Sequence, residues 1–189
     1  MKEKGFSIVE LLVVVSVISI LLAVSIAGFP QIKANLSLIR QANNFQQDLR
    51  IAQEMALSGA LYKDSSGIER QIDGYGVFVD ILGLGSKKYI IYADKSPGNK
   101  QYDNSDYIIL NSDFSLSEKG VKFQQINNVF LNKTSVNFSN SKIETSINQL
   151  NFGQSSAEFI FSLESDSSKT KKVIVNTAGL IEVKSIYEH

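Results

Sequence analysis

The stretch that decides the fold is residues 5–10, Gly-Phe-Ser-Ile-Val-Glu, which leads directly into a nearly all-apolar run over residues 11–29. No charged residue occurs between Leu11 and Ile32, and about 20 apolar helical residues are enough to cross the hydrocarbon layer of a bilayer. Lys2 and Lys4 precede the run, and positive charge at this place keeps an N-terminus on the cytoplasmic side. The stretch therefore predicts a membrane-spanning helix close to the N-terminus.

Glu10 is the residue that a simple membrane anchor does not need. A carboxylate at the depth of the bilayer costs several kcal/mol or more, so residues of this kind are usually functional. Glu10 also keeps a fixed spacing to a small residue, Gly5, and an aromatic residue, Phe6. Since a buried carboxylate is tolerated when a cation pairs with it, the pattern indicates that Glu10 meets a positive group.

This spacing resembles the N-terminal signal of the type IV pilin and pseudopilin superfamily, which has Gly, Phe, three residues, Glu and then an apolar helix. The resemblance covers residues 1–31. It implies that a prepilin peptidase cuts between Gly5 and Phe6 and that the new Phe6 amine is N-methylated. It also implies that Glu10 neutralises the Phe6 amine of a neighbouring subunit, which would fix the axial register between helices in a filament.

Two alternatives remain open from the sequence. The apolar run can serve as the plain anchor of a single-pass β-rich binding module, with Lys2 and Lys4 as its ordinary positive flank. Alternatively, Ser25-Ile26-Ala27 satisfies the small-x-small rule of signal peptidase, and cleavage there would release a secreted domain.

The apolar run ends at two residues that disfavour a helix, Gly28 and Pro30. Proline lacks the amide donor and its ring clashes with the preceding turn, so a helix break with a bend or a melted stretch is expected here. Beyond Lys33, apolar residues recur at steps of three and four, which predicts an amphipathic helix over residues 30–62 that packs on the rest of the chain.

The C-terminal part predicts an all-β domain. A polar loop over 63–73 precedes segments rich in β-branched and aromatic residues. These predicted strands are 74–81, 88–93, 106–110, 120–126, 135–138, 149–152, 157–163, 172–175 and 180–183, and the last two form a hairpin in which Gly179 supplies a positive φ. The fold class is α+β, with a leader at 1–5, a membrane or filament-core helix at 6–29, the amphipathic helix at 30–62 and a β-rich head at 63–189.

A second resemblance is to the minor, H-type (FimT-like) pseudopilins of type II secretion. Three motifs carry it: Arg40 with Leu49-Arg50-x-Ala52 and Glu54-x-Ala56 in the helix, Gly74-Tyr-Gly-Val at the start of the β-domain, and the final hairpin with Asn176 and Gly179. It implies a structural subunit of a pilus or pseudopilus. Its partners would be sibling pilins, the prepilin peptidase and the inner-membrane assembly platform.

Composition argues against several other classes. Nineteen Lys and Arg balance nineteen Asp and Glu, so no large basic field attracts nucleic acid. The chain has no cysteine, its single histidine is the last residue, His189, and neither a phosphate-binding loop nor a nucleophile elbow occurs. We therefore expect no catalytic site and no cofactor.

The sequence also holds candidate residues for a calcium site and for DNA contact. Asp94, Asn99, Asp103 and Asp106 gather oxygen donors that suit Ca²⁺, although a polar hairpin turn explains them more simply. Four lysines near the C-terminus are the candidates for DNA contact, but acidic residues lie among them and no arginine follows Arg70. The candidates are Lys169, Lys171, Lys172 and Lys184. Localisation is expected at the bacterial inner membrane, with the head outside the cytoplasm, and then in a filament.

Overall fold

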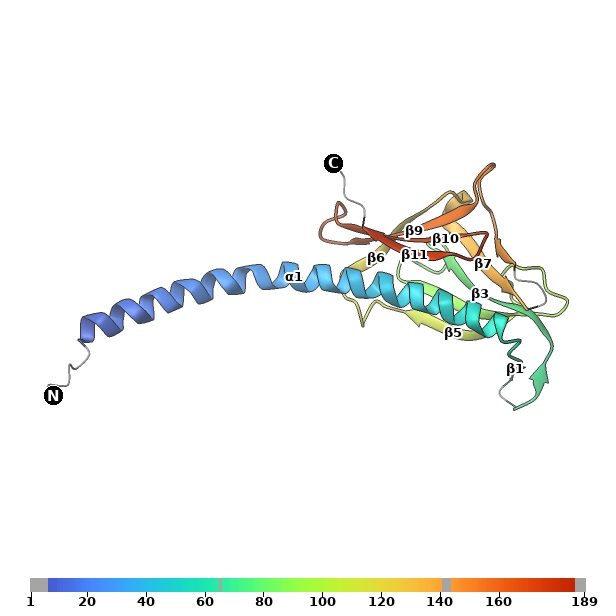
Figure 1. Cartoon of the computed structure of the whole chain (residues 1–189), viewed down its shortest axis with the longest axis horizontal. Coiled ribbons are helices and arrows are strands. Elements are labelled where there is room, and N and C mark those ends of the chain that lie inside the picture. Colours follow the sequence, from blue (N-terminus) through green and yellow to red (C-terminus); the bar gives the residue numbers. More distant parts are fainter. Residues whose placement is uncertain (1–6, 65, 141–143, 186–189) are drawn as a thin grey trace.

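The structure is a computed structural model that describes residues 7–64, 66–140 and 144–185. One long helix runs from the N-terminal end into a β-rich head, so the molecule has the shape of a rod with a head at one end (Figure 1). The first half of the rod projects freely, whereas the second half lies along the sheets of the head. The predicted α+β class is confirmed.

Helix α1 (Ile8–Leu57) is continuous over 50 residues. The hydroxyl of Ser7 accepts a hydrogen bond of 3.3 Å from the Val9 amide, which caps the first turn. At the other end Ser58 is the C-cap, and Gly59 follows with a φ of 63°, which a residue without a side chain adopts easily.

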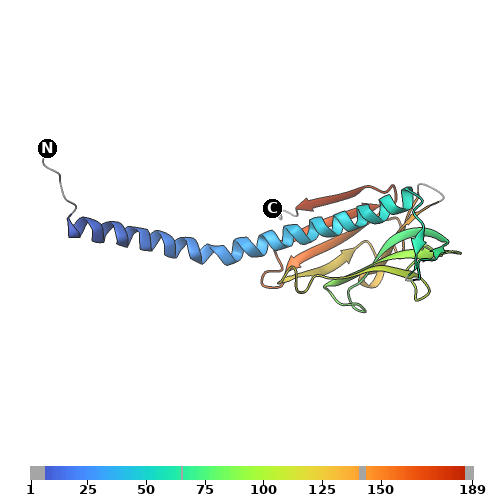
Figure 2. The same ribbon diagram turned by 90° about the horizontal axis from the view of Figure 1, so that it is seen from below.

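The structure corrects two expectations about this helix. Pro30 lies inside α1 and no break occurs at Gly28 or Pro30. Of the two expected outcomes, the bend is present as a change in direction of the helix axis between its two halves (Figure 2). No stretch is melted, since helical turns on both sides maintain the ladder around the single missing amide. The helix also ends at Leu57 and not at residue 62, because positive-φ Gly59 ends it early.

The head contains two larger antiparallel sheets. The five-stranded sheet has the order β5-β4-β3-β7-β8, and the four-stranded sheet has the order β11-β10-β9-β6. Strands of the first sheet are β3 (Ile72–Asp80), β4 (Lys88–Lys95), β5 (Tyr107–Asp113), β7 (Lys133–Ser139) and β8 (Thr145–Ile147). Strands of the second are β6 (Val121–Asn127), β9 (Ser156–Leu163), β10 (Thr170–Asn176) and β11 (Ile181–Ser185), and a 3-10 turn, η1 (Phe130–Asn132), precedes β7.

Most predicted strands are present, with three differences. The expected loop over 63–73 holds a small hairpin, β1 (Tyr62–Lys63) with β2 (Glu69–Arg70). The predicted strand at 149–152 is reduced to an isolated bridge between Val129 and Leu150, and β8 was not predicted. The closing hairpin is confirmed, and Gly179 has a φ of 83°.

The core lies where α1 meets both sheets. Phe45 on α1 is fully buried, and its ring contacts four aromatic rings edge-on at centroid distances of 4.9 to 5.5 Å. The four are Tyr89 on β4, Phe123 on β6, and Phe159 and Phe161 on β9. Since Tyr89 belongs to one sheet and the others to the second, Phe45 ties the two sheets to the helix.

Candidate assembly helix and processing site

The free half of α1 presents apolar side chains to its surroundings on every face. Every described side chain from Ser7 to Lys33 is exposed, and Ile8, Val24 and Phe29 are 83%, 70% and 70% exposed. By length and composition this helix can cross a membrane. A surface of this kind is unstable in water, so it requires lipid or the helices of other subunits as its environment.

Glu10 is the only charged residue between Ile8 and Ile32, and it lies in the first turn of α1. Acidic side chains in a first turn lie near the positive end of the helix dipole. Gly5 and Phe6, the predicted processing residues, lie outside the described residues. Their spacing to Glu10 is therefore known from the sequence, whereas the position of Glu10 is known from the helix.

Three serines interrupt the apolar surface without leaving an unsatisfied hydroxyl. Ser16, Ser19 and Ser25 donate to carbonyl oxygens one turn earlier at distances of 2.7, 2.8 and 2.9 Å. A hydroxyl bonded in this way costs little to transfer from water into hydrocarbon. Between Ile8 and Phe29, Glu10 thus remains the one described polar side chain that needs an external partner.

The second half of α1 is fastened to the final hairpin by side chains that the sequence alone did not single out. Gln53 donates to the Gly179 carbonyl at 2.9 Å, and Gln46 donates to the Ile181 carbonyl at 3.2 Å. A Cβ at Gly179 would lie 2.8 Å from the Gln53 amide nitrogen and would displace this side chain, while the φ of 83° itself favours glycine. These bonds make the helix and the head one unit.

Arg40 and Glu118 form the closest ion pair between the helix and a loop of the head. Arg40 Nε lies 2.9 Å from Glu118 Oε1, and Arg40 Nη2 lies 3.0 Å from Glu118 Oε2. The Glu118 side chain is only 8% exposed, and the hydrogen bonds from Arg40 lower the pKa of its carboxyl. Arg40 was part of a sequence resemblance, but its partner lies 78 residues away and could not be identified from spacing.

The candidate calcium residues are engaged in hydrogen bonds within their own loop and with its neighbours. Asp94 is buried, and its Oδ2 accepts from the Lys100 amide at 2.9 Å and from Asn137 Nδ2 at 3.1 Å. The Asp106 carboxylate accepts the amides of Lys95 and Asp103, while Asn99 donates to Asp103 at 2.9 Å. In the described part of the chain, no group of three or more acidic or histidine side chains is placed to hold a metal. Several of these oxygens accept hydrogen bonds from backbone amides of the turn that follows β4.

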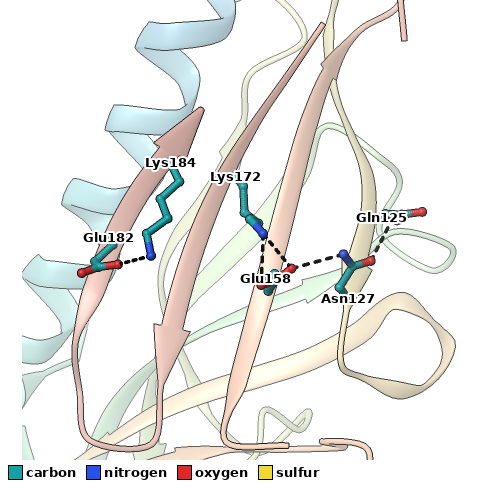
Figure 3. Close-up of polar contacts among 6 residues, drawn as sticks. All are labelled: Gln125, Asn127, Glu158, Lys172, Glu182 and Lys184. Carbon is teal, nitrogen blue, oxygen red and sulfur yellow. Dashed lines mark hydrogen bonds and ion pairs between the residues drawn. The ribbon is translucent and has the colours of Figure 1, made fainter. Parts of the chain in front are cut away.

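Three of the four lysines considered for DNA contact lie within ion-pair distance of carboxylates. Lys172 Nζ lies 3.1 Å from both oxygens of Glu158, and Lys184 Nζ lies 2.9 Å from Glu182 (Figure 3). Lys171 donates to Ser185, and Lys169 lies 3.9 Å from Asp166. The carboxylate partners reduce the positive charge that this region presents to a phosphate backbone.

Comparison with known proteins agrees with the N-terminal motif. Residues 1–26 match the model for the prokaryotic N-terminal methylation motif. No curated protein and no solved structure matches the chain. The matched segment holds Gly5, Phe6 and Glu10, and it ends within the free half of α1. The chain is thus similar to prepilin-type proteins over this N-terminal segment, and the segment leads into a long helix that packs against antiparallel sheets.

Proposed function

We propose that the chain is a minor pilin or pseudopilin, a structural subunit of a type IV pilus or a type II secretion pseudopilus. One observation carries this function: a single carboxylate, Glu10, stands alone on a helical surface that is otherwise apolar, fully exposed and long enough to span a bilayer. A membrane anchor alone has no use for such a group, whereas a filament core can pair it.

Processing takes place at the junction of the leader and the helix. Prepilin peptidase cuts between Gly5 and Phe6, and Phe6 then carries the methylated N-terminal amine. The motif match over residues 1–26 supports this site. So does the start of α1 at Ile8 with Ser7 as its cap, because only Phe6 would precede the cap after cleavage.

In the filament, Glu10 pairs with the Phe6 amine of a neighbouring subunit. The apolar side chains around Glu10 pack about equally well at many axial positions of one helix relative to the next. A charge pair at low dielectric, in contrast, favours one axial position. Glu10 therefore sets the axial register. A subunit that keeps this carboxylate is suited to a position beneath another subunit.

In functional terms, residues 1–5 are the leader and residues 6–29 form the membrane and filament-core helix. The helix of the head follows from residue 30 and ends at Leu57, and residues 63–189 form the surface domain. Before assembly the chain sits in the inner membrane with the head outside the cytoplasm. The assembly platform, the peptidase and sibling pilins are its partners. Within this class we favour an H-type pseudopilin, on the basis of the Arg40 and Gly74 motifs.

The test is co-expression with a prepilin peptidase, followed by mass spectrometry of the intact chain and of its N-terminal peptide. The expected product begins at Phe6 and carries one extra methyl group on its amine. A Gly5→Val variant should remain uncut, because its branched side chain replaces the small residue at the cleavage site, while a Ser7→Ala control should be cut normally.

Other products would point to the competing functions. A chain that begins at Gly28 would show cleavage after Ala27 and a secreted module. An uncut chain in the presence of active peptidase would show an anchored module that does not enter filaments. Either product would contradict the proposed function.

A further inference from the structure

A groove of about 470 Å³ lies where α1 leaves the head. One wall is the helix, and the other is the loop over residues 114–120 that links β5 to β6. The groove is lined in part by Pro30, Lys33, Ala34, Leu116 and Lys119. Its lining residues on α1 begin at Pro30, so the groove lies next to the free half of the rod.

Along α1, the groove lies at the height expected for the surface of a bilayer that the helix spans. Lys33 is the first charged residue after Glu10. At 1.5 Å per residue, the helix between Glu10 and Lys33 is about 35 Å long, and the hydrocarbon layer is about 30 Å thick. If Glu10 lies at the cytoplasmic edge of this layer, Lys33 and the groove lie among the lipid headgroups on the other side.

The charge of the groove is positive. Lys33 and Lys119 are both exposed, and neither forms an ion pair with any residue that the structure describes. Arg40 also lines the groove, and its bidentate contact neutralises Glu118, the nearby carboxylate. Among the described residues, no carboxylate lines the groove. An anion that enters it therefore meets cations from both walls.

An apolar residue stands beside these cations. Leu116 is 82% exposed at the tip of the loop, which is a high exposure for a leucine in a head with a well-formed core. Pro30 and Ala34 continue this apolar surface down the helix toward the bilayer. Lysines next to an exposed leucine form the pattern of a surface that lies in a membrane interface.

We propose that this groove binds the headgroup of an anionic phospholipid from the membrane that α1 spans. The lipid phosphate lies between Lys33 and Lys119, and Leu116 enters the interface beside it. Binding would fix the orientation of the head relative to the bilayer before the subunit is taken into a filament. The inference requires only that α1 spans a membrane, and it does not depend on filament assembly.

The experiment uses the full chain in vesicles. The protein has no cysteine, so a fluorophore on Ser117→Cys labels the loop alone. We compare phosphatidylcholine vesicles with vesicles in which one third of the lipid is phosphatidylglycerol, and we measure quenching by a lipid that carries a quencher on its headgroup. Quenching should be stronger with phosphatidylglycerol, and salt should weaken this difference.

A charge-matched pair of variants provides the control. Lys33→Gln with Lys119→Gln removes the proposed contacts, and the ratio of docked to undocked heads should fall about fivefold for each lysine lost. Lys63→Gln with Lys100→Gln removes the same charge from β1 and from the loop after β4, and should leave quenching unchanged. Circular dichroism confirms that both double variants keep the fold.

Three outcomes would overturn the lipid site. The first is equal quenching in both kinds of vesicle, and the second is an equal loss of quenching in the two double variants. The third is quenching that follows protein density and not lipid charge, which would assign the groove to a second copy of the chain. None of these outcomes affects the proposed function, because cleavage at Gly5 and filament entry are not measured in these vesicles.

Discussion

Glu118 shows how a single buried carboxylate is kept charged. It lies on the loop before β6, and the guanidinium of Arg40 binds both of its oxygens. The residue as a whole, backbone included, is only 6% exposed. A carboxylate without that partner would lose its hydration at this site and gain little in return. The pair therefore fixes the loop that carries Leu116 and Lys119 against α1.

Glu118→Gln should lower the free energy of unfolding by about 1 kcal/mol at neutral pH, because the charged hydrogen bonds are weakened. The pKa of Glu118 is lowered from its ordinary value of 4.5, chiefly by hydrogen bonds from Arg40. Its contribution is thus fully present above about pH 4.5 and is lost as the pH falls through the folded-state pKa.

The measurement is denaturant unfolding of the full chain in detergent, at a series of pH values from 7 downward. The difference between wild type and Glu118→Gln should shrink as the solution becomes acidic below the ordinary glutamate value. A difference that stays constant over that range would show that the charge of Glu118 does not stabilise the fold.

Gly76 is a second residue whose identity the structure explains. A Cβ at this position would lie 2.6 Å from the Tyr92 ring and 2.6 Å from the Val136 carbonyl oxygen. Tyr92 is fully buried, so its ring cannot move aside freely. The glycine in the Gly74-Tyr-Gly-Val motif is therefore required by the close approach of β4 and β7 to β3.

Gly76→Ala should destabilise the head by about 1–3 kcal/mol, as overpacking of a core commonly does. Thermal unfolding followed by circular dichroism measures the effect. Gly28→Ala is the matched control, since nothing lies within 4 Å of the added methyl group. Equal melting temperatures for Gly76→Ala and the control would contradict the steric explanation.

At the scale of elements, α1 has two halves with opposite surroundings. The half up to Lys33 has no described contact with the head, whereas the later half buries one face, including Ala42, Phe45, Leu49 and Ala52, completely. Ala42 and Ala52 let the helix backbone approach the sheets closely. Phe45 fills the space between the two sheets. The first half is thus available to other molecules while the second half holds the fold.

Phe45→Ala should cost about 3–5 kcal/mol of stability, because it leaves a cavity among four aromatic rings. Asn44→Ala, an exposed neighbour on the same helix, should change stability by no more than about 0.5 kcal/mol. Denaturant unfolding of both variants tests this. A small loss for Phe45→Ala would mean that the two sheets hold together without the helix.

Structural features that depend on neighbouring residues can be predicted from the sequence. The apolar run, the stripe through Phe45 and the positive φ of Gly179 each follow from neighbouring residues, and the structure agrees. Features set by distant residues could not be obtained in this way, such as the partner of Arg40 and the short strand β8, which is fixed by pairing with β7. Pro30 was misjudged because its local cost is outweighed by the helical turns on both sides.

For the whole molecule, the arrangement separates the helical surface proposed for assembly from the folded surface of the head. The free half of α1 provides an apolar surface with one charge, Glu10, at its far end. The folded surface of the head begins about one bilayer thickness away from that charge. The groove at their junction lies where the two environments meet. Changes in the head therefore need not disturb the helix that would enter a filament core.

The central claim is that Glu10 holds the chain in a filament and is not needed for membrane insertion. The direct measurement is the amount of Glu10→Ala chain in sheared filaments, divided by the amount in carbonate-washed membranes, in cells that express the sibling subunits. Ser16→Ala, which alters another exposed polar residue of the same helix, is the control. Glu10→Ala should reach the membrane normally and be reduced about tenfold or more in filaments, corresponding to a lost charge pair of at least about 1.4 kcal/mol, whereas equal incorporation of Glu10→Ala and wild type would contradict the account.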